Sequence, residues 1–184
     1  MKDRAKFFGL DKTENFKEFE EKYLNAAETV EKSEEKAYNS IVEMLQASSD
    51  ARKDFKFISD ERFNQLTIAA RKQGATILRG TDDVEAHLDA MGASASTIGD
   101  VLLFRKDVCV CEVLEETHHF MQNLRGMNND KGEPLRTILN EIDAKNFVIM
   151  NADKYKVPRN EIEMIERQLA SYQRQLTEHL KGGE

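Results

Sequence analysis

The amino-acid sequence predicts a helix-dominated α+β fold built around a small central sheet. Residues 14–50 contain neither Gly nor Pro, which is typical of one long helix or of two helices in line. Two short runs in the middle of the chain, "ATILRG" and "VLLFR", are typical of strands. Near the C-terminus, apolar residues recur at steps of three and four, as on one face of a helix (Ile162, Ile165, Leu169, Tyr172, Leu176 and Leu180).

The first part of the chain predicts a separate helical arm over residues 1–55. Its apolar residues recur at steps of three, four or seven but thin out around Ala26 and Ser33, so a stable isolated coiled coil is not expected. The arm is instead expected to pack on the body or to bind a partner chain, including a second copy in a homo-oligomer. The remainder, residues 56–184, is expected to form one α+β domain.

Capping signals define the first helices of this domain. Ser59 is expected to cap a helix that runs to about Lys72. Asp82 and Glu85 are spaced like a capping box, which would open a helix that ends at Gly92. The next segment, "ASASTIGD", consists of small and polar residues and is expected to form turns.

The second half of the domain is predicted to be helical after the strand "VLLFR". Asp107 is expected to cap a helix that ends near Gly126. A loop rich in Asn, Asp and Gly follows, and residues 135–155 are predicted to form the next helix. Pro158 stands in the first turn of the last helix, where proline is tolerated.

Composition argues against two classes of partner. The net charge is -7, and no basic stripe offsets the acidic excess, so a general nucleic-acid binder is not expected. No run approaches the roughly 18 apolar residues that cross a bilayer. The N-terminus also lacks the features of a secretory signal. These observations predict a cytoplasmic protein, or one that other machinery delivers as part of a secreted effector or a phage particle.

Two cysteines, Cys109 and Cys111, are separated by one residue. A single C-x-C pair without a second Cys or His pair is a weak metal-binding signal. Cysteines so close in sequence rarely form a relaxed disulfide. We therefore interpret them as ordinary buried thiols, which are common in protein cores.

The segment "VLEETHHFMQ", residues 113–122, contains the strongest candidate for a functional site. Glu115 and His119 are four residues apart and therefore share one face of a helix, with Glu116 beside them. This is the geometry of the H-E-x-x-H motif of zinc hydrolases, except that the first position is Glu. An ordinary surface helix would show the same charged face, because the apolar stripe of the segment points the other way.

An acid on the following helix completes a candidate set of ligands. Glu141, in "ILNEIDAKNF", stands where a third ligand would come from a separate helix, with Asp143 close behind it. A catalytic zinc site takes three protein ligands and leaves a fourth position for water. His118 is expected to be packed or half-exposed, and His87 and His179 are expected at the surface.

From about residue 60 to 182, the order "VLLFR", "VLEETHHFMQ" and "NEIDA" resembles zincin-like metallopeptidase domains of the gluzincin type, in which an edge strand precedes the active-site helix. The strings "EVLEE..H..Q", "LNEIDA" and "KYKVPRNEIE" are more closely similar to C-terminal domains of phage minor head proteins and bacterial polymorphic toxins.

The resemblance implies a role for each candidate residue. Glu115, His119 and Glu141 would bind the metal, and Glu116 would be the general base. The metal would be Zn²⁺, with Mn or Fe as alternatives that carboxylates also suit. A cluster of three carboxylates and one histidine would need a cation or a protonated carboxyl to avoid self-repulsion. The substrate would be a protein or peptide, and an immunity protein or a phage head protein would be the partner.

Three other functions remain open. The zincin-like fold could serve as a binding or structural module without catalysis or cofactor. "ILRG", "SAST" and "EVLEE" stand in the order of an ADP-ribosyltransferase signature, although the residues between them leave little room for that fold. Glu116-x-x-His119 also has the spacing of a di-iron ligand pair, but that site needs a second such pair, and the sequence has none.

Overall fold

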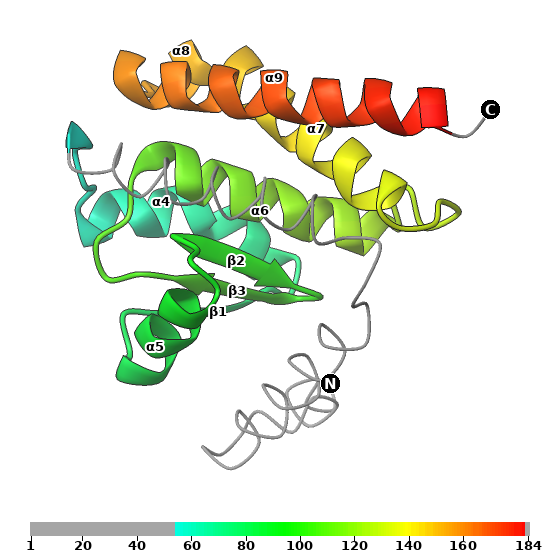
Figure 1. Cartoon of the computed structure of the whole chain (residues 1–184). Helices are drawn as coiled ribbons and strands as arrows, with labels where there is room; N and C mark the ends of the chain where they lie inside the picture. The colour runs from blue at the N-terminus through cyan, green and yellow to red at the C-terminus, as the bar shows by residue number, and fades with distance from the viewer. Residues whose placement is uncertain (1–53, 183–184) are drawn as a thin grey trace. The chain divides into compact units, whose positions relative to one another are not determined.

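Three short strands form a mixed sheet at the centre of the fold (Figure 1). The computed structural model describes residues 54–182, so the helix predicted over residues 14–50 lies outside the described part. The strands β1 (Thr76–Arg79), β2 (Ala95–Ile98) and β3 (Val101–Phe104) lie in the order β1-β3-β2. β3 pairs in parallel with β1 and antiparallel with β2.

Helices make up most of the rest of the described chain. They are α4 (Asp60–Lys72), α5 (Asp82–Ala90), α6 (Val110–Arg125), α7 (Leu135–Met150), α8 (Ala152–Tyr155) and α9 (Arg159–Gly182). The prediction of a helix-dominated α+β fold with a small sheet is therefore confirmed. The single helix expected over residues 135–155 is divided at Asn151, which ends α7 and precedes α8.

The segment that was expected to form only turns contains strand β2. Ala95–Ile98 pairs with β3 through a tight hairpin, in which Gly99 and Asp100 are the two loop residues. Gly99 has a φ of 63°, and glycine at the first loop position is the requirement of a type II′ hairpin turn. The prediction was wrong because Ala and Ser have low strand propensity by themselves, whereas pairing with the apolar strand β3 makes this segment a strand.

Strand β3, "VLLF", is the central strand of the sheet and not an edge strand. All four of its residues are buried, because β1 and β2 flank it and helices cover both of its faces. The resemblance to zincins implied an edge strand in this position, and the structure corrects that expectation. The edge strand on the side of the candidate site is β2, which also contacts α6.

Helix α6 occupies the middle layer of the domain (Figure 1). It contacts the sheet and α4 on one side, and α7 and α9 on the other. Helix α5 covers the opposite face of the sheet (Figure 1). Because α6 is covered on two sides, its buried residues include polar ones, Glu112, Glu116 and Gln122, beside apolar ones such as Phe120.

The helix ends show which capping signals were interpreted correctly. Ser59 caps α4, and its hydroxyl accepts a hydrogen bond from the Arg62 N–H. The cap of α5 is Thr81 and not Asp82, because the Thr81 hydroxyl accepts the bond from the Val84 N–H. Similarly, the N-cap of α6 is Cys109 and not the expected Asp107. The Glu112 carboxylate accepts a hydrogen bond from the backbone N–H of Cys109.

Gly126 ends α6 as predicted, in the left-handed conformation with a φ of 65°. A non-glycine residue in this conformation costs roughly 1–2 kcal/mol. We therefore expect Gly126→Ala to lower the free energy of unfolding by about that amount, measured by urea denaturation. Gly132→Ala is the matched control, because Gly132 has no positive φ and a Cβ there would meet nothing within 4 Å. Equal effects of the two substitutions would contradict this account.

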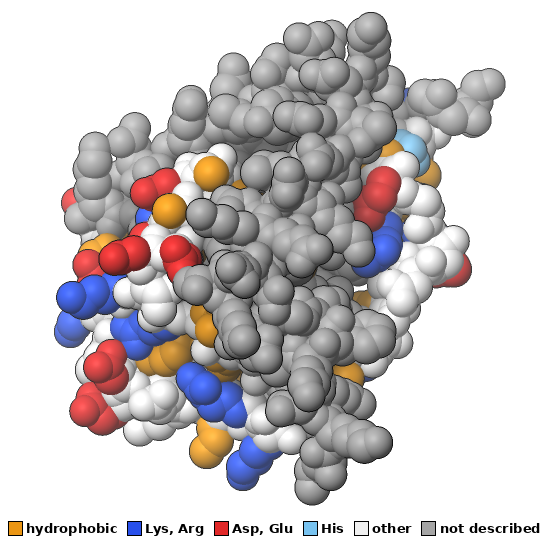
Figure 2. All heavy atoms as spheres, turned by 90° about the horizontal axis from the view of Figure 1, so that it is seen from below, with side chains coloured by type: hydrophobic (Ala, Val, Ile, Leu, Met, Phe, Trp, Pro, Cys, Tyr) orange, Lys and Arg blue, Asp and Glu red, His pale blue; other side chains and the backbone are white. Residues whose placement is uncertain are grey.

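On the face shown in Figure 2, the described acidic and basic side chains are interspersed. Within residues 54–182, no helix has the length and apolar character needed to span a membrane.

Candidate metal centre

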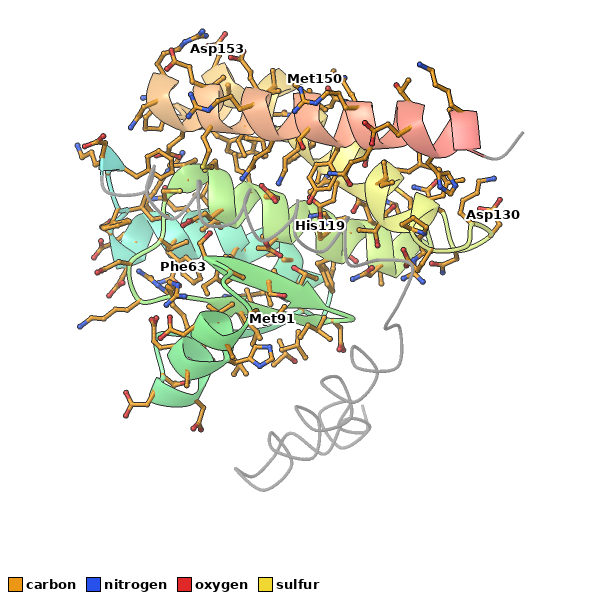
Figure 3. The ribbon with its side chains drawn as sticks, in the orientation of Figure 1. Phe63, Met91, His119, Asp130, Met150 and Asp153 are labelled. Carbon is orange, nitrogen blue, oxygen red and sulfur yellow. The ribbon has the colours of Figure 1, made fainter. Side chains whose placement is uncertain are left out.

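Glu115 and His119 of α6 converge with Glu141 of α7. One potential ligand atom from each of these side chains lies within 4.8 Å of the other two. His119 Nε2 lies 3.3 Å from Glu141 Oε1 and 4.0 Å from Glu115 Oε1. His119 lies on the side of α6 that faces α7 (Figure 3). The structure therefore brings together the three residues that the sequence suggested as metal ligands.

Gln122 fixes the orientation of the His119 ring. The Gln122 amide nitrogen donates to the Asn140 carbonyl and to Asp143 Oδ2, each at 2.8 Å, and both of these groups are acceptors. The Gln122 amide oxygen therefore faces His119 Nδ1, at 2.8 Å. An amide oxygen can only accept, so Nδ1 carries the proton. His119 Nε2 is thus the nitrogen directed at the two glutamates, and this is the orientation that a metal-binding histidine needs.

Lys145 of α7 supplies a positive charge to the cluster. Its ammonium donates to Glu115 Oε1 and lies 3.4 Å from Glu141 Oε2. The Lys145 side chain is only 4% exposed. The cation that the clustered carboxylates require is therefore a side chain of the protein itself.

The buried charges shift one another's pKa values. Burial alone would lower the pKa of His119, but the hydrogen bond to Glu141 and the nearby carboxylates raise it to about 10. Burial alone would raise the pKa of Glu141, but the charge of Lys145 and the bond to His119 lower it to about 2. In the absence of a metal, His119⁺ and Lys145⁺ thus neutralise two carboxylates between α6 and α7.

Glu116, the predicted general base, lies next to this cluster and is 7% exposed. The hydroxyl of Thr97 in β2 donates to Glu116 Oε2 at 2.7 Å. Burial raises the pKa of Glu116 to about 7, although the positive charge on His119 counteracts it. The edge strand β2 therefore holds the carboxylate of Glu116 in position.

The four predicted residues line one cleft of about 340 Å³. The turn before β2 and β2 itself form one wall, from Ala93 to Thr97. Helix α9 contributes Met164, Gln168 and Tyr172 to the opposite side, and α7 contributes Arg136 and Asn140. The candidate ligands are thus accessible to a small molecule or to a segment of chain.

Asp143 and the other histidines lie outside the candidate ligand set. Asp143 accepts one hydrogen bond from Gln122 and pairs with His118 Nε2 at 2.7 Å, so it supports the cluster from outside. His118 also stacks on Phe147, in agreement with its expected packing role. His179 is exposed as predicted. His87 is 6% exposed, so its expected surface position was wrong; it lies on the face of α5 that packs against the sheet.

Sequence reasoning did not identify Lys145, Thr97 or Gln122 as parts of the site. Two of them had a local signal. Glu141 and Lys145 are spaced i,i+4 on one helix, and His119 and Gln122 are spaced i,i+3. Thr97 had none, because its place beside Glu116 depends on the unpredicted strand β2.

No family model matches the chain, and neither a curated protein nor a solved structure matches it.

Proposed function

We propose that this cleft is the active site of a metal-dependent hydrolase that cleaves peptide bonds. The observation that carries the proposal is the convergence of Glu115, His119 and Glu141, contributed by two helices, within 4.8 Å of one another. The resemblance to zincin-like domains of phage head proteins and polymorphic toxins supports the same function and a protein substrate.

The three side chains suit a divalent metal chemically. Zinc takes both imidazole nitrogen and carboxylate oxygen as ligands, and three protein ligands leave one position for water. Carboxylates are hard ligands, so Mn or Fe would fit as well. A divalent cation would replace Lys145⁺ between Glu115 and Glu141, because both cations compete for the same oxygens. It would also replace the proton on His119 Nε2.

The residues around the ligands have definite parts in a hydrolysis. Zn²⁺ held by these three residues would supply a water whose pKa falls from about 15.7 towards 7, and it would polarise the scissile carbonyl. Glu116 would accept the proton from the attacking water, because its carboxylate lines the same cleft and Thr97 holds one of its oxygens. Gln122 would keep His119 Nε2 directed at the metal.

A peptide is the substrate that the walls of the cleft favour. Among the described residues, β2 pairs only with β3, so the other edge of β2 offers free backbone N–H and C=O groups. Extended peptides bind such edges by adding a strand. Ala95, Ser96 and Thr97 of this strand line the cleft and would hold the peptide beside Glu116.

Metal analysis of the purified protein tests the proposal. We expect wild-type protein soaked with Zn²⁺ to hold one more ion per chain than His119→Ala, because Nε2 is the only nitrogen among the three ligands. His179→Ala is the matched control, because His179 is exposed and distant in sequence from the cluster. Equal metal content in wild type and His119→Ala would remove the hypothesis, as would the absence of bound metal after soaking.

A non-catalytic scaffold is the second candidate, and Lys145 is the observation that favours it. Its ammonium already satisfies Glu115 and Glu141, so the cluster is stable without a metal. In that case the cluster joins α6 to α7, and the cleft or the N-terminal arm binds a partner chain. This candidate predicts that Glu116→Gln leaves the function intact.

A further inference from the structure

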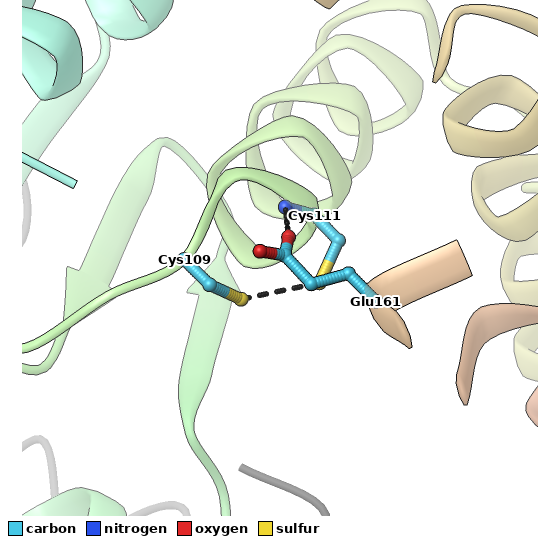
Figure 4. Close-up of side chains that lie close together, drawn as sticks. All are labelled: Cys109, Cys111 and Glu161. Carbon is cyan, nitrogen blue, oxygen red and sulfur yellow. Dashed lines mark hydrogen bonds between the residues drawn. The ribbon is translucent and has the colours of Figure 1, made fainter. Parts of the chain in front are cut away.

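A second cluster of potential ligands lies at the start of α6. Cys109 is the N-cap residue of α6, Cys111 lies in its first turn, and Glu161 comes from the first turn of α9. The two sulfurs are 3.2 Å apart, and Glu161 Oε2 accepts a hydrogen bond from the Cys111 N–H at 3.0 Å. The three side chains point toward one another (Figure 4), and their potential ligand atoms lie within 4.8 Å of one another.

One oxygen of this cluster lacks a hydrogen-bond partner. Cys109, Cys111 and Glu161 are each 0% exposed, and Glu161 Oε1 is buried without a hydrogen bond. A buried polar atom without a partner costs about 1–3 kcal/mol, and more when the group is charged. Thiols are weak donors, and neither of these two satisfies Oε1. The carboxylate therefore lies beside two sulfurs while one of its two oxygens, Oε1, has no hydrogen-bond partner.

We propose that Cys109, Cys111 and Glu161 form a second metal site, which holds a thiophilic divalent cation such as Zn²⁺. Cysteine sulfurs select zinc over the hard cations magnesium and calcium. Two thiolates and one carboxylate carry one more negative charge than such a cation neutralises. The N-terminus of α6, where both cysteines lie, provides a compensating positive dipole.

The geometry requires only a small adjustment to accept the ion. Two thiolates at a Zn–S distance of about 2.3 Å in a tetrahedral site lie roughly 3.8 Å apart. The observed separation is 3.2 Å, so the side chains must move apart by about half an ångström. The bound ion would join the start of α6 to the start of α9. This site shares no residue with the proposed active site and goes beyond the proposed function.

Cobalt binding distinguishes this site from the other one. Co²⁺ replaces Zn²⁺ in tetrahedral sites and gives a near-ultraviolet sulfur-to-cobalt charge-transfer band only when thiolates bind it. The full-length His119→Ala variant is refolded with Co²⁺ under reducing conditions, so that the buried site is accessible during loading. We expect the band at one Co²⁺ per chain. Refolded protein without a sulfur-to-cobalt band would overturn the proposal, whatever the outcome at Glu115 and Glu141.

Substitution of each ligand then tests the composition of the site. Cys109→Ser and Cys111→Ser are expected to reduce the band and to weaken binding. Glu161→Gln keeps an oxygen that can accept the Cys111 N–H, so we expect the fold to persist while Co²⁺ affinity falls at least tenfold. Glu163→Gln, on the exposed side of the same helix turn, is the matched control. Circular dichroism of each metal-free variant verifies folding. Unchanged affinity in a folded Glu161→Gln protein would overturn the three-ligand site.

Discussion

Lys145→Met is expected to lower the free energy of unfolding of the metal-free protein by about 3–5 kcal/mol, the usual cost of removing one partner from a buried ion pair. Methionine keeps most of the apolar stem but removes the charge, so Glu115 and Glu141 lose the cation between them. Urea denaturation monitored by circular dichroism measures the change. Lys181→Ala, at the exposed end of α9, is the control and is expected to change stability by less than about 0.5 kcal/mol.

A double variant separates the charge effect from a packing effect. Lys145→Met combined with Glu115→Gln removes the ammonium and one of its two carboxylates. Replacing both members of a buried pair is often close to neutral, so the double variant should lose less stability than the two single variants combined. Simple additivity would mean that the pairing energy is small.

Addition of Zn²⁺ to the Lys145→Met variant tests whether the cluster binds a metal. If a divalent cation binds between Glu115 and Glu141, Zn²⁺ should restore stability to Lys145→Met by about 2.7 kcal/mol at a concentration one hundred times its Kd. The affinity of this variant for Zn²⁺ should also exceed that of the wild type, because the competing ammonium is gone. A Lys145→Met protein that Zn²⁺ does not stabilise would favour the scaffold function.

Glu116→Gln is expected to reduce peptide hydrolysis by the metal-loaded protein by about 10²- to 10⁴-fold, the usual contribution of a general base. Glutamine has nearly the same shape, and its amide oxygen can still accept the hydrogen bond from Thr97. The variant should therefore fold and bind metal while it loses turnover. A quenched fluorescent peptide library, with Zn²⁺ or Mn²⁺ present, measures the rate.

The control for this prediction is Glu178→Gln, an identical chemical change on the exposed part of α9. Its rate should match that of the wild type. Metal content and circular dichroism of Glu116→Gln must also match the wild type, so that the lost rate is assigned to proton transfer. Full activity in a folded, metal-loaded Glu116→Gln protein would contradict the role of Glu116.

Most helices of the described part could be predicted from the sequence, because their ends carry local signals. Gly126 and Ser59 stand at the expected ends of α6 and α4. Strand β2 could not be found from propensity, since its first residues, Ala95 and Ser96, became a strand by pairing with the apolar β3. The exchange of Asp107 for Cys109 at the cap of α6 has a local cause. Glu112 reaches back to the cap from inside the helix, and local spacing left this alternative open.

The candidate ligands could be proposed from spacing, but their surroundings could not. Glu115 and His119 share a helix face by simple periodicity, whereas the arrival of Glu141 depends on how α7 crosses α6. The sequence pattern left open whether the charged face of α6 points toward solvent or lines a cleft. The structure covers this face with α7 and α9, which explains why Glu116 and Gln122 are buried. The same tertiary packing brings Glu161 to the two cysteines, 50 residues away along the chain.

The middle position of α6 has a consequence for how the domain unfolds. The sheet and α4 make few direct contacts with the helical pair α7 and α9. Both groups of elements instead pack against α6. If either group separated from α6, buried residues of α6 such as Phe120 or Gln122 would be exposed to water. Loss of α7 would also leave His119 without its partner Glu141. The two halves are therefore thermodynamically linked, and a ligand that stabilises the cleft also protects the distant strands against melting.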